Sequence, residues 1–189
     1  MDNSRDAGNA VEIDGLSVTI EHGLQIASLR YFDAAGGFAT TVRETLGQPL
    51  PEPLRAGRAG ATPDAHIILA WRSPTETLIL GNHGAAFAEL ERRLASAADG
   101  CMVDQTGGIR VLRLQGRRAG DLLLRLGAAT AIPALSEARS SRLAELHVLT
   151  ACVQAGQYLL LVERVYAKHL LDWIGATVAD FSGGSHTQV

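Results

Sequence analysis

Residue types that could carry chemistry are few in this sequence, and they lie far apart. The six histidines are scattered, and neither a His-x-x-x-His nor a Cys-x-x-Cys spacing occurs, which argues against a metal site. Gly107 and Gly108 precede a strand-like run, whereas a dinucleotide-binding loop needs glycines after a strand and at the start of a helix. A Gly-Lys-Ser/Thr phosphate loop and a Gly-x-Ser-x-Gly nucleophile turn are both missing from the sequence. We therefore predict no catalytic, cofactor-binding or metal-binding residue in this chain.

Two pairs of residues are candidates for contact with another protein. Trp71 and Arg72 end a strand-like run, and a large aromatic beside a planar donor is typical of an interface anchor. Arg110 and Arg113 open an arginine cluster that could meet an acidic partner. The alternatives are a core tryptophan beside solvent-facing arginines, and a solvated arginine face. Trp71, Arg72, Arg110 and Arg113 are the partner-interface residues that we predict.

Residues 104–108, Asp-Gln-Thr-Gly-Gly, form a third local feature. Asp104 could hold a ligand amine or an arginine of a partner. Asp and Thr before two glycines also form turns in which their side chains satisfy their own backbone, and we favour this structural interpretation.

Composition and charge exclude several classes of protein. Hydrophobic residues make up 47% of the 189 residues and charged residues 20%, which is typical of a globular chain. The formal charge of −3 gives no general attraction to nucleic acid or to anionic membranes. Cys101 and Cys152 fit a reducing compartment, no apolar run is long enough to span a bilayer, and the N-terminus has no signal-peptide layout. We expect a cytoplasmic protein with no nucleic-acid or membrane partner.

Hydrophobic periodicity predicts the same order of elements twice. In each half a strand is followed by a helix, a hairpin and a second helix, at about residues 24–96 and 101–176. The offset is about 80 residues, which matches Leu69 with Leu149 and Leu80 with Leu160. Residues 47–64, rich in proline and glycine, are predicted to be a connection without strand pairing.

The domain boundaries follow from this repeat. We expect residues 1–19 to be flexible or loosely packed, residues 20–181 to form a single domain of two repeats, and residues 182–189 to be a disordered tail. A β-α-β-β-α unit has one apolar sheet face and two helices to cover it, so two units predict one compact α+β body.

The order of several motifs resembles the sarcosine oxidase gamma-subunit family. The similarity covers about residues 20–181, and its segments are Ile67–Leu80, Val103–Gly107, Val111–Ala119, Tyr158–Arg164 and Leu171–Ile174. The individual motifs are degenerate, and their order carries the resemblance.

This resemblance implies a fold like that of the glycine-cleavage T protein and related folate-binding domains. It also implies a non-catalytic, structural gamma subunit of a heterotetrameric flavin-dependent oxidase that demethylates sarcosine to glycine. FAD, FMN, NAD and tetrahydrofolate would then lie on larger alpha-, beta- and delta-type partner subunits, and the isolated chain would bind none of them and have no activity. The alternatives are a subunit of a related N-methyl amine oxidase or dehydrogenase, and a free-standing folate-binding one-carbon protein.

Overall fold

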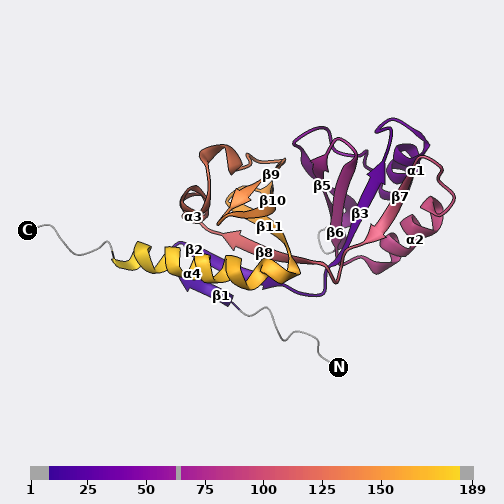
Figure 1. The fold of residues 1–189 in the computed structure, drawn as a ribbon. Helices are drawn as coiled ribbons and strands as arrows, with labels where there is room; N and C mark the ends of the chain where they lie inside the picture. The colour runs from indigo at the N-terminus through magenta and orange to yellow at the C-terminus, as the bar shows by residue number, and fades with distance from the viewer. Residues whose placement is uncertain (1–8, 63–64, 184–189) are drawn as a thin grey trace, which may run out of the picture.

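Two antiparallel sheets and four α-helices make up the described part of the molecule (Figure 1). The structure is a computed structural model, and it describes residues 9–62 and 65–183. Sheet B has five strands in the order β4-β5-β6-β3-β7, and sheet A has six in the order β1-β2-β8-β11-β10-β9. The predicted α+β fold class is confirmed.

Sheet B and its two helices are built from the first half of the chain. Helix α1 buries Phe38, Val42 and Leu46, which recur every fourth residue, and it ends at Gly47 in the left-handed conformation that glycine adopts readily. The elements in chain order are β3 (Gln25–Tyr31), α1 (Gly37–Leu46), β4 (Ala56–Thr62), β5 (Ala65–Ser73), β6 (Glu76–Gly81), α2 (Gly84–Leu94) and β7 (Gly100–Asp104).

Sheet A combines the second half of the chain with the N-terminal strands. Helix α3 buries Leu122, Leu123 and Leu126 against this sheet, and α4 buries Leu170, Ile174 and Val178. The elements are β1 (Asn9–Ile13), β2 (Leu16–Glu21), β8 (Ile109–Gln115), α3 (Ala119–Leu126), the 3₁₀ turn η1 (Ala129–Ala131), β9 (Glu137–Leu143), β10 (Leu146–Gln154), β11 (Gln157–Glu163), the 3₁₀ turn η2 (Arg164–Tyr166) and α4 (Ala167–Gly183).

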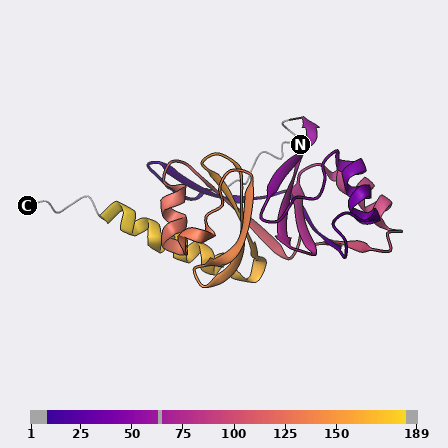
Figure 2. The same ribbon diagram turned by 90° about the horizontal axis from the view of Figure 1, so that it is seen from above.

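The two sheets pack face to face, and the helices cover their outer faces (Figure 2). Alternate residues of each strand therefore face a helix layer or the opposite sheet. Ile79 and Leu160 face helices, whereas Leu80 and Leu161 lie between the sheets. The strands are consequently apolar on both faces, which explains their continuous apolar runs in the sequence.

The two halves exchange a strand. Strand β7 follows the first half yet pairs with β3 in sheet B, whereas β2 precedes the first half and pairs with β8 in sheet A. The segments 22–24 and 105–108 therefore cross between the sheets, and the N–H of Gln105 donates to the carbonyl of Ile26 at 2.8 Å. The exchange links the halves, since each sheet contains a strand from the other side of the predicted boundary near residue 101.

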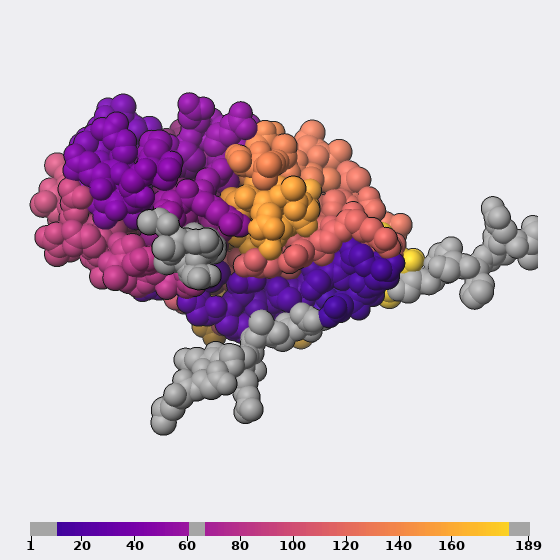
Figure 3. Space-filling model, turned by 180° about the vertical axis from the view of Figure 1, so that it is seen from behind, coloured from indigo at the N-terminus to yellow at the C-terminus, as the bar shows by residue number. Residues whose placement is uncertain are grey.

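Two predictions about irregular segments differ from the structure. Leu16 and Val18, assigned to a loosely packed N-terminus, lie in β2 and are 2% and 0% exposed, and the N-terminal strands cover the lower side of the second half (Figure 3). Strand β4 lies within the predicted unpaired connection 47–64, where Ala56 pairs with Ala70. Residues 1–8, 63–64 and 184–189 lie outside the described residues, so the predictions for them stay untested.

The offset between the hairpins of the two halves is 81 residues rather than 80. Ile68 pairs with Leu80, and Leu149 pairs with Leu161, 81 positions further in both strands. The predicted match of Leu69 with Leu149 was wrong by one residue, and a shift of one residue moves a side chain to the other face of a strand. Leu69 indeed faces the helices, whereas Leu149 lies between the sheets.

Candidate functional site: the cavity between the sheets

The faces that the two sheets turn toward each other change from apolar to polar at one end. In sheet B, the inter-sheet side of β5 runs from Ile68 to Ala70 to Arg72, and that of β6 from Leu80 to Leu78 to Glu76. In sheet A, the corresponding side of β10 runs from Leu149 to His147, and that of β11 from Leu161 to Glu163. Because the strand ends meet, the polar side chains surround one space.

That space is a cavity of about 380 Å³. Its polar wall is formed by Arg72 and Glu76 from sheet B and by Ser140, His147 and Glu163 from sheet A. Leu78, Leu149 and Leu161 form part of its apolar floor. A volume of this size and a few converging polar groups are typical of a site for a small molecule.

Glu76 is held at one position by three neighbours. The buried hydroxyl of Ser28 donates to Oε1 at 2.5 Å, Nη1 of Arg72 donates to the same oxygen at 3.2 Å, and Nε of Arg30 lies 3.8 Å away. Glu76 is 16% exposed, so these donors offset the cost of removing its charge from water.

Several polar groups of the cavity have no partner among the described residues. His147 and Glu163, which are exposed, make no hydrogen bond or ion pair. The Oγ atom of Ser141 is also buried without a hydrogen bond among the described residues, but it lies on the helix-covered face of sheet A, because Ser141 pairs with Val148. Among the described residues the guanidinium of Arg72 bonds only Glu76, while the Arg72 carbonyl accepts from Ser140 Oγ at 3.3 Å. A donor-rich guanidinium and a carboxylate are therefore both available to a ligand.

This arrangement is suited to binding rather than to nucleophilic catalysis. An activated serine needs a base within hydrogen-bond reach, and within residues 9–62 and 65–183 neither Ser140 nor Ser141 bonds His147. The described residues contain no group of three or more His, Cys, Asp or Glu side chains that could hold a metal ion. Cys101 and Cys152 are free thiols, and burial raises the pKa of Cys152, which keeps it protonated and unreactive.

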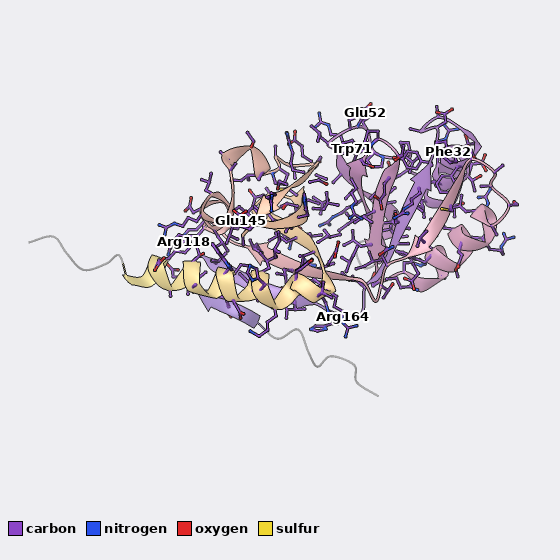
Figure 4. All side chains as sticks on the ribbon, in the orientation of Figure 1. Phe32, Glu52, Trp71, Arg118, Glu145 and Arg164 are labelled. Atoms are coloured by element: carbon purple, nitrogen blue, oxygen red, sulfur yellow. The ribbon has the colours of Figure 1, made fainter. Side chains whose placement is uncertain are left out.

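The structure separates the four predicted interface residues. Arg72 lines the cavity, and Trp71, on the opposite face of β5, is half-buried at the upper rim of sheet B (Figure 4). Arg110 lines a smaller cavity of about 160 Å³ beside the crossing segments. Arg113 bonds Glu21 on β2, with Nε and Oε1 2.5 Å apart. Whether these residues contact a partner stays a prediction.

Residues 104–108 follow the structural interpretation. The N–H of Thr106 donates to Asp104 Oδ1 at 2.8 Å, and this bond lowers the pKa of Asp104. Thr106 Oγ1 accepts from the N–H of Ile26 at 3.0 Å and thereby joins the two crossing segments. Asp104 thus caps its own turn, as the sequence favoured.

Three further arginines that follow Arg110 and Arg113 in the sequence have partners within the chain. The guanidinium groups of Arg118 and Arg125 lie 4.4 and 4.3 Å from the ring centre of Phe181, so they hold the end of α4 by cation–π contacts. Arg117 pairs with Asp14 at the β1–β2 turn. These contacts explain part of the cluster without an acidic partner.

Sequence reasoning missed Glu76, His147 and Glu163. A signal was present, because each follows or precedes an apolar stretch of its strand with the period of two that marks one face. Their convergence depends on which strand ends meet when the sheets pack, and the sequence alone gives no such pairing.

Comparisons with known proteins identify the fold. No protein-family model matches the sequence, and no curated protein is similar to it in sequence. A chain of the heterotetrameric sarcosine oxidase from Corynebacterium sp. U-96, in complex with pyrrole 2-carboxylate, superposes with a TM-score of 0.79 and 19% identity, over 96% of this chain and 91% of that one.

A second structure extends the comparison. The glycine cleavage system aminomethyltransferase T from Bartonella henselae superposes with a TM-score of 0.62 and 14% identity. The match covers 85% of this chain but 45% of the transferase, so this chain corresponds to less than half of that protein. The fold is therefore that of a sarcosine oxidase chain and of part of a T protein. No helix within residues 9–62 and 65–183 is both long enough and apolar enough to cross a membrane.

Proposed function

We propose that this chain is the non-catalytic gamma-type subunit of a heterotetrameric, flavin-dependent sarcosine oxidase. The observation that carries the proposal is the end-to-end match, over 96% and 91% of the two chains, to a chain of such an oxidase. The order of sequence motifs supports it independently. In this proposal the chain supports the oxidative demethylation of sarcosine to glycine in the cytoplasm, together with alpha-, beta- and delta-type subunits.

The proposal assigns the redox chemistry to the partners. FAD, FMN, NAD and tetrahydrofolate belong to the larger subunits, and this chain contributes structure and contact surface. Exposed apolar side chains support a role in an assembly: Val165, Tyr166 and Trp173 are 78%, 48% and 46% exposed along η2 and α4.

Purification of the tagged chain from its native host tests this role. The expected result is a stoichiometric complex that contains larger subunits, absorbs as a flavoprotein and oxidises sarcosine. A chain that elutes as a monomer, with no flavoprotein attached, would overturn the proposal.

Two tryptophan variants locate the contact surface in the same experiment. If the predicted interface is correct, Trp71→Ala reduces recovery of the partners, and Trp173→Ala tests whether the exposed apolar face of α4 contributes as well. A loss of recovery with Trp173→Ala alone would overturn the predicted interface and assign the contact to α4, while the subunit role would stand. Circular dichroism of both variants checks that each remains folded.

Two alternatives make different predictions. A subunit of a related N-methyl amine oxidase or dehydrogenase would purify in a similar complex, but that complex would turn over another N-methyl amine faster than sarcosine. A free-standing folate-binding protein is favoured by the likeness to the aminomethyltransferase. In that case tetrahydrofolate would bind the isolated chain saturably, and no large subunit would accompany it.

A further inference from the structure

We infer that the outer edge of strand β7 is a docking site for an extended segment of a partner protein, which carries an apolar and a basic side chain on opposite faces. Strand β7 (Gly100–Asp104) is the last strand of sheet B, and among the described strands it pairs with β3 alone. A sheet edge can accept a further strand through its unpaired N–H and C=O groups. The inference goes beyond the subunit role, because it defines the partner segment by its chemistry.

The hydrogen bonds at both ends of β7 identify the backbone groups at this edge. The N–H of Phe32 donates to the carbonyl of Asp99 at 3.0 Å, and the N–H of Gln105 donates to the carbonyl of Ile26 at 2.8 Å. Residues 99, 101, 103 and 105 therefore bond β3, since the direction of bonding alternates along an antiparallel strand. The N–H and C=O groups of residues 100, 102 and 104 consequently point outward, and they make no hydrogen bond with another described residue.

Strand β7 lacks the features that usually protect an exposed edge. Its sequence, Gly-Cys-Met-Val-Asp, contains no proline, lysine or arginine, and its register with β3 is continuous, without a bulge. No residue of β7 belongs to the described core between the sheets, so sheet A leaves this strand uncovered. Phe32, at the rim of the same sheet, is 88% exposed (Figure 4).

A cavity of about 510 Å³ lies on the inter-sheet side of this edge. Cys101 pairs with Arg30, and Arg30 pairs with Glu76, so these three side chains share one face and line the cavity. Phe32 and Ala98 add apolar surface to it. A residue paired with Cys101 in an added strand would direct its side chain to this face, where a large apolar side chain fits.

A second cavity, of about 330 Å³, lies on the helix-covered side of the same strand. Met102, which packs in the helix-covered core, lines it together with Asp104 and with Glu91 of α2. Both carboxylates are exposed and form no ion pair with a described residue, and a backbone hydrogen bond from Thr106 lowers the pKa of Asp104, which keeps it charged. A residue paired with Asp104 would point to this side, where a basic side chain would meet two negative charges.

The two cavities define the spacing within the partner segment. Cys101 and Asp104 are three positions apart, so the side chains paired with them point to opposite faces. An antiparallel segment is favoured, because every strand pair of sheet B is antiparallel. A second copy of this chain fits less well, since the one charged residue of its β7 is an aspartate, which offers no positive charge to Glu91.

A fluorescein-labelled peptide, Thr-Lys-Val-Thr-Phe-Thr, tests the edge on the purified full chain. In antiparallel pairing its lysine lies opposite Asp104 and its phenylalanine opposite Cys101. Fluorescence anisotropy is expected to show saturable binding, and replacement of the lysine by glutamate should weaken that binding about tenfold. Hydrogen exchange should slow at the amides of residues 100, 102 and 104, whereas residues 101 and 103 already bond β3. Absence of saturable binding would overturn the proposal, and a chain that dimerises with these amides protected would assign the edge to a second copy.

Substitutions of Met102 separate strand addition from contact with the general surface. Met102→Pro removes an outward N–H without removing a hydrogen bond to β3, and it should weaken peptide binding at least about tenfold. Met102→Leu keeps the N–H and a similar volume, so it should change binding by no more than about twofold. Equal binding by the two variants, with circular dichroism showing that both are folded, would contradict strand addition.

A pair of glutamate variants on α2 tests the charge independently of the backbone. Glu91→Gln should weaken binding of the lysine peptide about threefold. Glu89→Gln is the control, because Glu89 pairs with Arg92 and lies outside the cavity lining, and it should leave binding unchanged. Equal effects would contradict the assigned orientation. Copurification tests the subunit role separately, so a failure of peptide binding and a failure of that role are distinguishable.

Discussion

The two ends of the inter-sheet layer are related by the internal repeat, yet they differ in chemistry. At the open end, Arg72 and Glu76 line the cavity. The positions 81 residues later, Val153 and Gln157, lie toward the opposite end, where Gln157 Nε2 donates to Gln115 at 3.5 Å. The two ends therefore have matching hairpin positions, but only one of them is strongly charged.

The strand beside each hairpin, β3 in sheet B and β8 in sheet A, shows the same divergence. Ser28 in β3 pairs with Leu78, and its counterpart in β8, Arg113, pairs with Leu159, which is 81 positions after Leu78. Ser28 is small and buried and holds Glu76, whereas Arg113 is long and spans to Glu21. The same strand position is therefore small and buried in one sheet and long and charged in the other.

Truncation of a leucine side chain between the two sheets is expected to have the largest effect on the free energy of unfolding. Leu80 and Leu161 occupy equivalent positions, and they are 1% and 4% exposed. Leu80→Ala and Leu161→Ala should each lower the free energy of unfolding by about 2–5 kcal/mol, measured by urea denaturation. Leu161 borders the cavity, so its variant should fall near the lower end of that range.

An exposed leucine provides the control for this comparison. Leu135 is 55% exposed, and Leu135→Ala should change the free energy of unfolding by no more than about 0.5 kcal/mol. If Leu80→Ala cost as little as Leu135→Ala, the two sheets would not share a core.

At the cavity end of the layer, the free energy of unfolding is expected to depend on the hydrogen bond between Ser28 and Glu76. Ser28→Ala removes the hydroxyl that donates to Glu76 and leaves that carboxylate with fewer donors, which should cost about 1–3 kcal/mol in urea denaturation. Ser140→Ala is the control, because that exposed hydroxyl makes one bond of 3.3 Å to a carbonyl. Equal costs for the two variants would mean that Ser28 does not position Glu76.

The sequence predicted the elements whose pattern is local. The predicted order of strand, helix, hairpin and helix is present in the first half as β3, α1, the β5–β6 hairpin and α2. These features depend on neighbouring residues in the chain, so periodicity and turn chemistry were enough to find them.

The sequence did not predict features that arise from pairing between distant segments. Strand β4 is a short edge strand of small residues, so its pairing with β5 leaves little hydrophobic signal. Strand β7 pairs with β3 in sheet B, and no local pattern in the sequence of Gly100–Asp104 indicates this pairing. The cavity depends on both sheets at once, which is why Arg72 was found as a candidate while Glu163 was missed.

The ion pair between β2 and β8 should contribute moderately to stability. Glu21 is 19% exposed and Arg113 33%, so Glu21→Gln should cost about 1–2 kcal/mol, between the values for surface and buried pairs. Asp14→Asn is the control, since the Asp14–Arg117 pair is 88% and 71% exposed and should contribute about 0.5 kcal/mol or less. Thermal unfolding at low and high salt measures both, and only the Asp14 effect should vanish with salt.

The smallest effect that we expect has the opposite sign. Ser141→Ala removes a buried hydroxyl that has no partner among the described residues, so it should raise the free energy of unfolding of the ligand-free chain by up to about 1 kcal/mol. For a chain of this size that gain corresponds to a rise in melting temperature of about 2–4 °C in calorimetry. A destabilised variant would show that the hydroxyl forms a hydrogen bond in solution. A stabilised variant would show that the folded chain leaves this hydroxyl unsatisfied on the helix-covered face of sheet A, since Ser141 pairs with Val148 there.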